Sequence, residues 1–206
     1  MSPVVALSGK REQTKLANRS AILDAAREVF GELGYEVATV RDIIRRTGLA
    51  AGTFYNYYRS KEEVFEALAD DGAHRFRPIL RACFETSDSF ESYLRAAIRA
   101  YFDFIADEHD SWQARRPPTE RQPHMTIQTP EMERVYEEVH GAFLTAMERG
   151  DAPRVDAEYL ATAAIAITRE IGEQMLLRRP IDTNTAANFA VSLILGGVPA
   201  LPRQTP

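Results

Sequence analysis

Residues 52–58 read Gly-Thr-Phe-Tyr-Asn-Tyr-Tyr, and this aromatic run decides how the whole chain is interpreted. The segment before it opens with Thr39, whose hydroxyl can cap a helix N-terminus, and closes with Gly48, which tolerates the left-handed conformation that ends helices. We therefore expect one short helix from Val40 to Thr47 and another that begins near Ala51. Two helices this short cannot form an independent hairpin, so they must pack against a neighbouring helix.

The neighbour is the segment before them, expected to be helical over residues 19–33 and to stop at Gly34. Its apolar residues recur at the spacing of one helix face. These residues are Ile22, Ala25, Ala26, Val29 and Phe30. Downstream, Ser60 followed by two glutamates predicts the start of a long fourth helix toward Phe84, with Pro78 as a candidate kink.

The division of side chains between two faces predicts a helix-turn-helix in residues 39–58. The apolar side chains expected to pack against the first helix are Val40, Ile43, Ile44, Leu49, Phe54 and Tyr58. The side chains expected to face outward are Thr53, Tyr55, Asn56 and Tyr57. Outward side chains on a helix of this width can reach base edges in the DNA major groove, and an asparagine can bind adenine bidentately. Asn56 is therefore the best candidate for base readout.

The rest of the chain is also predicted to be helical. Helical composition recurs in residues 89–106, 131–149, 156–178 and 184–196, and no segment alternates with the period of a strand. Residues 115–130 contain four prolines and are expected to form a loop or a broken helix that could gate a pocket. We predict an all-α protein of about nine helices, with a three-helix DNA-binding domain joined to a larger C-terminal helical domain.

Composition sets the class of protein and the expected compartment. The chain has 206 residues and a formal net charge of −5, but residues 1–61 carry +4 and residues 62–206 carry −9. A positively charged N-terminal part joined to a negatively charged remainder favours an orientation in which the N-terminal part faces phosphate. No apolar run is long enough for a membrane span and no signal peptide is recognised, so a cytoplasmic protein without membrane contact is expected. The single cysteine, Cys83, excludes an intrachain disulfide and is expected to act as a small hydrophobe.

Residues 19–65 resemble the tetracycline-repressor (TetR) family of bacterial regulators at matching spacing throughout. The matching residues are Ile22, Ala25-Ala26, Phe30, Gly34-Tyr35, Thr39-Val40-Arg41-Asp42-Ile43, Gly48-Leu49, Gly52-Thr53-Phe54-Tyr55, Tyr57-Tyr58 and Ser60-Lys61-Glu62. The resemblance implies that the DNA contacts come from Thr39, Arg41, Ala51, Gly52, Thr53, Tyr55, Asn56, Tyr57 and Lys61. The chain departs from the family pattern at Ala50-Ala51, where a serine often caps the third helix, so that cap is missing.

The resemblance also implies a domain organisation. Residues 1–17 would be a basic arm, residues 18–64 the helix-turn-helix domain, and residues 65–206 a ligand-binding and dimerisation domain. Lys10, Arg11, Lys15 and Arg19 make the arm basic, and two alternatives stay open: it reaches into a DNA minor groove, or it is a solvated tail.

Two sets of residues in the C-terminal domain are candidates for its two roles. Residues 159–168 are apolar or small around the whole helix, which favours a helix covered on two sides. With the last helix it supplies a candidate dimer interface of Ala161, Ala164, Thr168, Phe189, Leu193 and Ile194. Candidate ligand-binding residues are Phe84, Tyr101, Phe104, Trp112, Tyr136, His140, Phe143, Arg169 and Glu173. An Arg169–Glu173 surface ion pair is the alternative for the last two residues.

An enzyme is not expected, because the sequence lacks paired acid and base residues, Gly-rich phosphate loops and nucleophile elbows. Glu137 and His140 form one Glu-x-x-His without the second copy that a di-iron bundle needs, so neither a metal nor another cofactor is expected. The predicted function is that of a TetR-like repressor. It would bind a palindromic operator in double-stranded DNA as a homodimer, and a small hydrophobic or amphipathic effector would release it. The alternative is a helical DNA-binding activator or an architectural protein without a ligand response.

Overall fold

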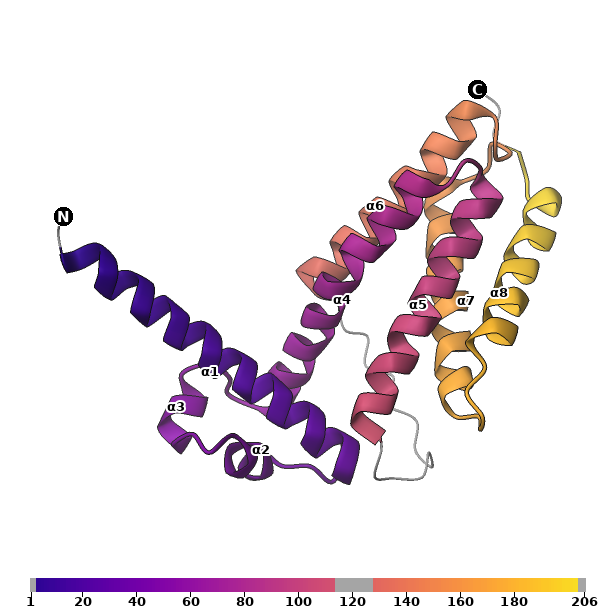
Figure 1. Cartoon of the computed structure of the whole chain (residues 1–206). Helices are drawn as coiled ribbons and strands as arrows, with labels where there is room; N and C mark the ends of the chain where they lie inside the picture. The colour runs from indigo at the N-terminus through magenta and orange to yellow at the C-terminus, as the bar shows by residue number, and fades with distance from the viewer. Residues whose placement is uncertain (1–2, 114–127, 204–206) are drawn as a thin grey trace. The chain divides into compact units, whose positions relative to one another are not determined.

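The computed structural model describes residues 3–113 and 128–203, and every regular element in these two ranges is helical (Figure 1). The elements are α1 (Pro3–Leu33), α2 (Val40–Thr47), α3 (Ala51–Tyr55), α4 (Lys61–Thr86), α5 (Phe90–Gln113), α6 (Pro130–Arg149), α7 (Ala157–Leu176), α8 (Thr183–Gly197) and a 3-10 helix, η1 (Val198–Ala200). The all-α prediction is confirmed. The chain divides into two compact units that meet in sequence between Ala69 and Asp70.

The core of the first unit is built on the apolar stripe of α1. Ile22, Ala26 and Val29 are almost completely buried, and they pack with Ile43 of α2 and Phe54 of α3 in one hydrophobic cluster. Val40, Ile44 and Leu49 are partly buried against the same cluster. The two short helices are therefore held by burial of apolar surface on α1, as the sequence pattern predicts.

Helix α1 begins earlier than the sequence analysis places it. The expected start near Arg19 is wrong, because α1 runs without interruption from Pro3 to Leu33 over 31 residues. Between residues 10 and 19 the sequence is rich in Lys, Arg, Glu, Gln, Ala and Leu, which are strong helix formers, and contains no proline. The segment expected to be an irregular arm or tail is thus an extension of the first helix.

Helix α4 also continues where a kink was a possibility. It runs from Lys61 to Thr86 as one helix that includes Pro78. Its start follows the prediction, because the backbone N–H of Glu63 donates to the hydroxyl of Ser60 at 3.2 Å. Two glutamates in the first turn, Glu62 and Glu63, suit the positive end of the helix dipole.

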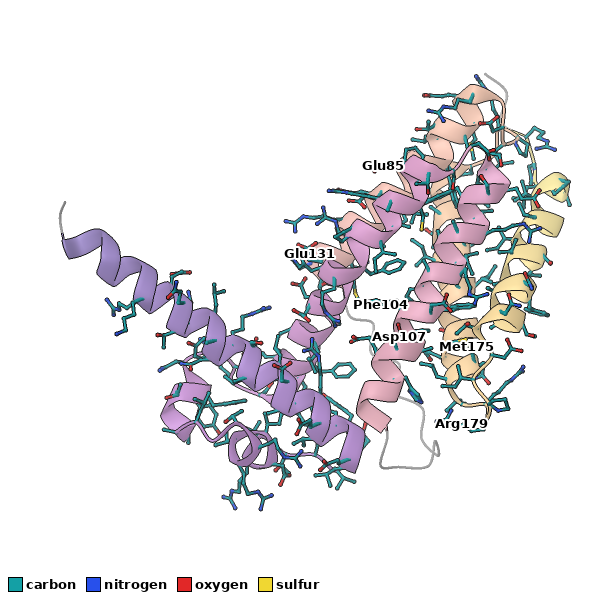
Figure 2. All side chains as sticks on the ribbon, viewed as in Figure 1. Glu85, Phe104, Asp107, Glu131, Met175 and Arg179 are labelled. Carbon is teal, nitrogen blue, oxygen red and sulfur yellow. The ribbon has the colours of Figure 1, made fainter. Side chains whose placement is uncertain are left out.

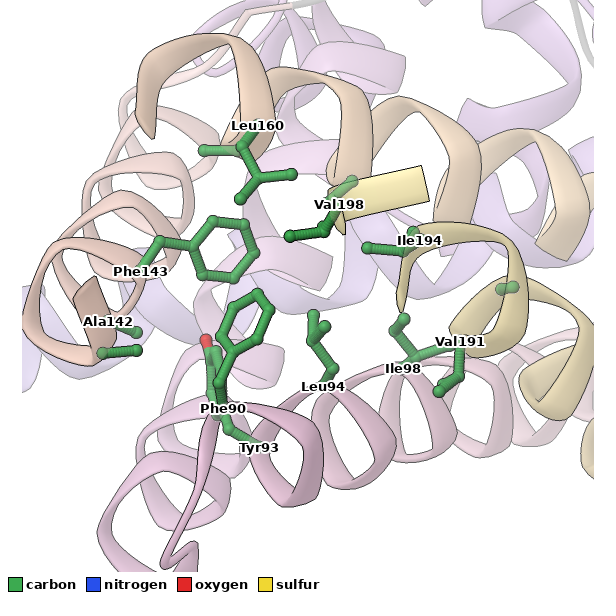
Figure 3. Close-up of a cluster of buried hydrophobic side chains, with 14 of the residues drawn as sticks. Phe90, Tyr93, Leu94, Ile98, Ala142, Phe143, Leu160, Val191, Ile194 and Val198 are labelled. Atoms are coloured by element: carbon green, nitrogen blue, oxygen red, sulfur yellow. The ribbon is translucent and has the colours of Figure 1, made fainter. Parts of the chain in front are cut away.

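The second unit packs α5, α6, α7 and α8 around a large apolar core (Figure 3). Phe102 and Phe143 are fully buried, and the ring of Phe143 lies 5.2 Å from that of Phe90 in an edge-on arrangement. Helix α7 approaches α5 closely at Gly172, where an added Cβ would lie 2.7 Å from the Ile105 methyl and 3.3 Å from the Phe102 ring. These contacts pack α5 and α7 closely against each other at Gly172.

A partly buried ion cluster joins α4 to α6. Arg77 donates to Glu131 at 2.6 Å and to Glu138 at 3.0 Å, and Arg81 donates to Glu138 at 2.6 Å. The side chains of Arg77 and Glu131 are only 17% and 12% exposed. The backbone N–H of Glu131, in the first turn of α6, donates to the carboxylate of Asp70 at 3.1 Å. Because of its hydrogen bond from Arg77, the pKa of Glu131 lies below its ordinary value.

The lowered pKa of Glu131 predicts a loss of stability in acid. A carboxyl group whose pKa is lower in the folded than in the unfolded state contributes stability above its unfolded pKa, about 4.3 for glutamate, and loses it as the pH falls toward the folded value. We expect the midpoint of thermal unfolding of Glu131→Gln to lie below wild type at pH 7 and to approach it between pH 5 and pH 3. Circular dichroism melts measure this difference.

Glu133→Gln is the matched control, since Glu133 is exposed on the same helix turn. This variant should follow the wild-type curve at every pH. A wild-type and a Glu131→Gln curve that stay parallel down to pH 3 would contradict the assignment.

Candidate DNA-binding surface

Helix α2 is capped at both ends as the sequence predicts. Thr39 and Asp42 form a capping box, in which the Thr39 Oγ1 accepts from the Asp42 backbone N–H at 3.3 Å and the Asp42 carboxylate accepts from the Thr39 backbone N–H at 3.1 Å. The Thr39 hydroxyl also donates to the Asp42 carboxylate at 2.6 Å, and this bond, followed by the one from the Thr39 backbone N–H, lowers the pKa of Asp42. At the other end Gly48 adopts a φ of 67°, a left-handed conformation that favours glycine. The contact of Thr39 with a phosphate stays a prediction.

The side chain of Thr47 holds the turn between α2 and α3, a role that was not predicted from the sequence. The Thr47 hydroxyl donates to the Ile44 carbonyl at 2.8 Å and accepts from the Leu49 backbone N–H at 3.0 Å. A threonine directly before a helix-ending glycine was the available signal. Ala38, directly before the Thr39 cap, is 2% exposed and belongs to the core of the first unit.

Helix α3 is short and is held from its inner side. It spans five residues, and Ala50 at its N-cap makes no side-chain capping bond, which confirms the expected loss of that cap. Phe54 is fully buried and Tyr58 is 8% exposed, with their ring centroids 6.3 Å apart. The position of this helix is therefore set by the core beneath it.

The outer side of α3 presents the side chains expected there, with one exception. Tyr55 is 56% exposed, Asn56 is exposed at the C-terminal end of the helix, and Thr53 is half-buried. Ala51 and Gly52 are exposed in the first turn. The expectation that Tyr57 faces outward needs correction, because its side chain is half-buried and packs against the core.

Lys61 makes contacts that the sequence did not predict. Its Nζ donates to the carbonyl oxygens of Tyr35 at 2.9 Å and Glu36 at 3.1 Å, and lies 4.6 Å from the centre of the Tyr35 ring. Two of its three N–H donors are thereby used to tie the start of α4 to the turn after α1. The Tyr35 hydroxyl donates to Glu62 at 3.2 Å, and burial raises the pKa of Tyr35 to about 12.

The arginines of α2 fall into two groups. Arg46 bridges to α1, donating to Glu28 and to Glu32 at 2.5 Å each, so it holds the two helices together. Arg41 and Arg45 are exposed, and Arg45 also pairs with Asp42. Figure 2 shows the side chains of α2 and α3 gathered beside α1. The arrangement is a supported pair of short helices with exposed basic, amide and aromatic side chains, which suits insertion into a nucleic-acid groove.

A family model described as bacterial regulatory proteins, tetR family, matches residues 22–68, the segment that holds this surface. Residues 22–68 thus carry the helix-turn-helix of the TetR family. The transcriptional activator FasR of Mycolicibacterium smegmatis is 29% identical over 189 residues, which is 89% of this chain and 84% of that relative. The transcriptional repressor AcnR of Corynebacterium glutamicum is 40% identical over 63 residues, 31% of this chain and 34% of AcnR. TetR-family transcriptional regulators are not enzymes, which agrees with the prediction.

Solved structures share the fold along most of the chain. The fatty acid degradation regulator FadR from Bacillus halodurans superposes with a TM-score of 0.72 at 22% identity, covering 88% of this chain and 96% of FadR. FadR from Bacillus subtilis in complex with stearoyl-CoA gives a TM-score of 0.72 at 20% identity, and the superposition covers 87% of this chain and 98% of that FadR chain. A TetR-like fold, with an N-terminal helix-turn-helix and a C-terminal helical domain, is thus established for this chain.

Four of the candidate ligand-binding residues, Tyr101, Phe104, Tyr136 and Phe143, belong to one hydrophobic cluster of the second unit, and the charges of Glu173 and Arg169 act on Tyr101. Tyr101 and Phe104 each lie 5.5 Å from the Phe76 ring inside the second unit, and burial raises the pKa of Tyr101 to about 12. Tyr136 stacks on His140 at 5.9 Å. Phe143 belongs to the core, and Phe84 is 38% exposed beside a small cleft. Arg169 pairs with Glu170, and Glu173 is half-buried. The side chain of Trp112 lies outside the described part of the chain.

The candidate dimer residues fall on two different sides of α7 and α8. Ala161, Ala164 and Ile194 are at most 5% exposed in the core of their own unit, so they cannot meet a partner helix, and this part of the prediction is wrong. Phe189 and Leu193 are 62% and 49% exposed, and Thr168 is half-buried. Three residues on the outer side of α7 that are not among the predicted interface residues are exposed, namely Tyr159, Thr162 and Ala163.

Neither a metal site nor a membrane span is found in the described ranges. No group of three or more His, Cys, Asp or Glu side chains is arranged there to hold a metal ion. The helices in these ranges are also too short or too polar to cross a membrane. Cys83 is half-buried, and burial raises the pKa of its thiol.

Proposed function

We propose that this TetR-family regulator is a homodimeric, effector-responsive repressor that binds a palindromic operator in the cytoplasm. The observation that carries the proposal is the pairing of a fully buried Phe54 with an exposed Tyr55 and Asn56 on one short helix. The buried side of α3 holds the helix in place, so its exposed aromatic and amide side chains can contact bases in the major groove.

The proposed contacts divide by chemistry. Asn56 reads adenine, while Tyr55 and Thr53 contact a thymine methyl or a phosphate. The phosphate backbone is held by the start of α2, with Thr39 and Arg41, and by the backbone N–H groups of Ala51 and Gly52 at the uncapped start of α3. Lys61 keeps one N–H donor for a phosphate while it holds its two carbonyl partners, whereas Tyr57 would have to leave the core contact described above.

A two-fold dimer gives the pair of recognition helices that a palindrome requires, with half-sites about 34 Å apart. Tyr159, Phe189 and Leu193 place large apolar side chains in solvent on α7 and α8, two helices that pack against each other (Figure 1). Large exposed apolar residues on adjoining helices are typical of a subunit interface. We assign the dimer contact to this outer side and to its smaller neighbours Thr162 and Ala163.

The proposed effector is a small hydrophobic or amphipathic molecule bound in the C-terminal domain, which corresponds to residues 65–206. Long-chain acyl-CoA is the first class to test, because FadR from Bacillus subtilis was solved with stearoyl-CoA. The effector would shift the dimer between two conformations of different operator affinity, and α4, a single helix that begins in one unit and ends in the other, would carry the change. A ligand with equal affinity for both conformations would shift nothing.

Selection of duplexes from genomic DNA tests the DNA-binding proposal. Wild-type protein should enrich a palindrome and prefer it over random duplex by at least about 10³-fold, with affinity falling steeply as salt rises. Absence of any sequence preference would favour an architectural protein instead. Transcription from the selected promoter in vitro decides between repression and activation, and activation would align the chain with FasR.

Asn56→Ala is the sharpest test of base readout. The loss of a bidentate amide contact should relax the preference at one position in each half-site and cost about 1–3 kcal/mol against the preferred base. Asn188→Ala, an exposed asparagine on α8, is the control and should bind the selected duplex like wild type. An unchanged base preference in Asn56→Ala would remove this residue from the readout.

Titration of the operator complex with stearoyl-CoA tests the effector class. Release of the DNA at micromolar ligand, with no release by free CoA, supports an acyl effector. Binding of the ligand to the protein without a change in operator affinity would contradict the proposed induction.

A further inference from the structure

The N-terminal extension of α1 carries a row of basic side chains on one face. Arg11, Lys15 and Arg19 are spaced four residues apart, so in this continuous helix they follow one another along one side, and we call them the basic stripe. Between residues 9 and 23 the extension has four basic residues and one acidic residue. Arg11 and Lys15 are exposed, and Arg19 is half-buried. No ion pair within the described ranges occupies Arg11 or Lys15.

The basic stripe continues the face of α1 that holds the helix-turn-helix. Three residues beyond Arg19 the same side carries Ile22, followed by Ala26 and Val29, which are buried in the core shared with α2 and α3. The stripe therefore points to the side of α1 on which α2 and α3 lie. Figure 1 shows the N-terminal part of α1 projecting past α3.

The depth of the DNA major groove places the phosphates of the flanking strands at the level of α1 when α3 lies in the groove. The major groove is about 8.5 Å deep, and packed helices lie about 8–10 Å apart, so strands that flank an inserted α3 stand back about as far as the next helix layer. From Arg11 to Arg19 the helix rises about 12 Å, which corresponds to three or four successive phosphates along one strand. The minor groove, at about 6 Å, is too narrow for a helix about 10 Å across.

We propose that the basic stripe binds the DNA phosphate backbone beside the half-site, so that each subunit holds more duplex than its helix-turn-helix covers. This inference rests on the proposed operator binding. It replaces insertion of an irregular arm into the minor groove by a helical contact to phosphates. The stripe contributes affinity and salt dependence, and it does not read bases.

The experiment compares equal losses of charge on two faces of α1. Lys10 is separated from Lys15 by about 140° around the helix axis, so Lys10→Gln removes the same charge from the other side. Wild type, Lys10→Gln, Lys15→Gln and Arg11→Gln/Lys15→Gln are titrated by fluorescence anisotropy. The probe is the duplex selected by wild-type protein with ten flanking base pairs on each side, at several salt concentrations.

For a duplex bound by both subunits, the double variant removes four cationic contacts. We expect the slope of log affinity against log salt to fall in magnitude by about 3–4, and affinity near 0.15 M salt to fall by at least tenfold. Lys10→Gln should stay within about twofold of wild type, base preference should be unchanged, and trimming the flanks should remove the difference between wild type and the double variant. Circular dichroism checks that the variants keep their helix content.

Equal effects of Lys10→Gln and Lys15→Gln would overturn the proposal, since they would show a general charge effect without a preferred face. Wild-type slope and affinity in the double variant would overturn it as well. If wild-type protein binds no duplex at all, the proposed function itself fails, and that outcome is distinct from both.

Discussion

Phe54→Ala is expected to abolish operator binding and to unfold much of the first unit while most of the helix content of the protein remains. Phe54 is fully buried between α3 and the core on α1, and removal of such a ring costs about 3–5 kcal/mol. A unit of this size has a total stability of only about 3–10 kcal/mol. Since α3 has no side-chain cap, it depends on the packing of Phe54 and Tyr58 against the core, and Phe54 is the more deeply buried of the two.

Phe54→Leu provides the comparison, because it keeps most of the buried volume and should cost less than about 1.5 kcal/mol. Anisotropy with the selected duplex and urea unfolding followed by circular dichroism measure both variants. Operator affinity in Phe54→Ala within a factor of two of wild type would show that the core does not position α3.

Phe189→Glu/Leu193→Glu is expected to give a monomer that no longer binds the palindrome tightly. The two side chains lie one helix turn apart on the exposed side of α8, so the substitutions leave the protomer core intact. In a two-fold interface each subunit would bring two unpaired carboxylates into an apolar contact, with a penalty of several kcal/mol. The dimer dissociation constant should rise by at least about 10³-fold.

Sedimentation velocity over a range of protein concentrations measures the oligomeric state. Asn188→Glu is the control, since Asn188 is exposed on the other flank of α8 and introduces the same charge beside the assigned face. A wild-type protein that is monomeric at micromolar concentration would contradict the assignment, as would a double variant that remains dimeric.

The helix-turn-helix could be predicted closely because short-range signals determine it. A threonine cap, a left-handed glycine and one apolar stripe define α2, and the buried positions of Phe54 and Tyr58 follow from helical spacing. The start of α1 could not be predicted in the same way. A basic segment without an apolar stripe is compatible with a solvated tail or with a helix, and only the propensity of its residues favours the helix.

The body of the protein was less predictable because its helices are apolar on more than one side. In α7 the spacing of small residues does not show which of them face the core of the protomer. Ala161 and Ala164 were predicted to face a partner subunit, but they lie in the protomer core. Lys61 and Arg46 illustrate a second limit. Their partners are 14 to 26 residues away in sequence, and only the tertiary structure brings them together.

The two-sided character of α3 affects how new binding specificities arise in descendants of this protein. Its inner residues hold the helix, whereas Tyr55 and Asn56 contribute little to the buried core. Exchange of an exposed residue usually changes stability by less than about 0.5 kcal/mol. Mutations at these two positions can therefore accumulate at almost no cost to folding, and a duplicated gene could acquire a new target sequence before its ligand response changes.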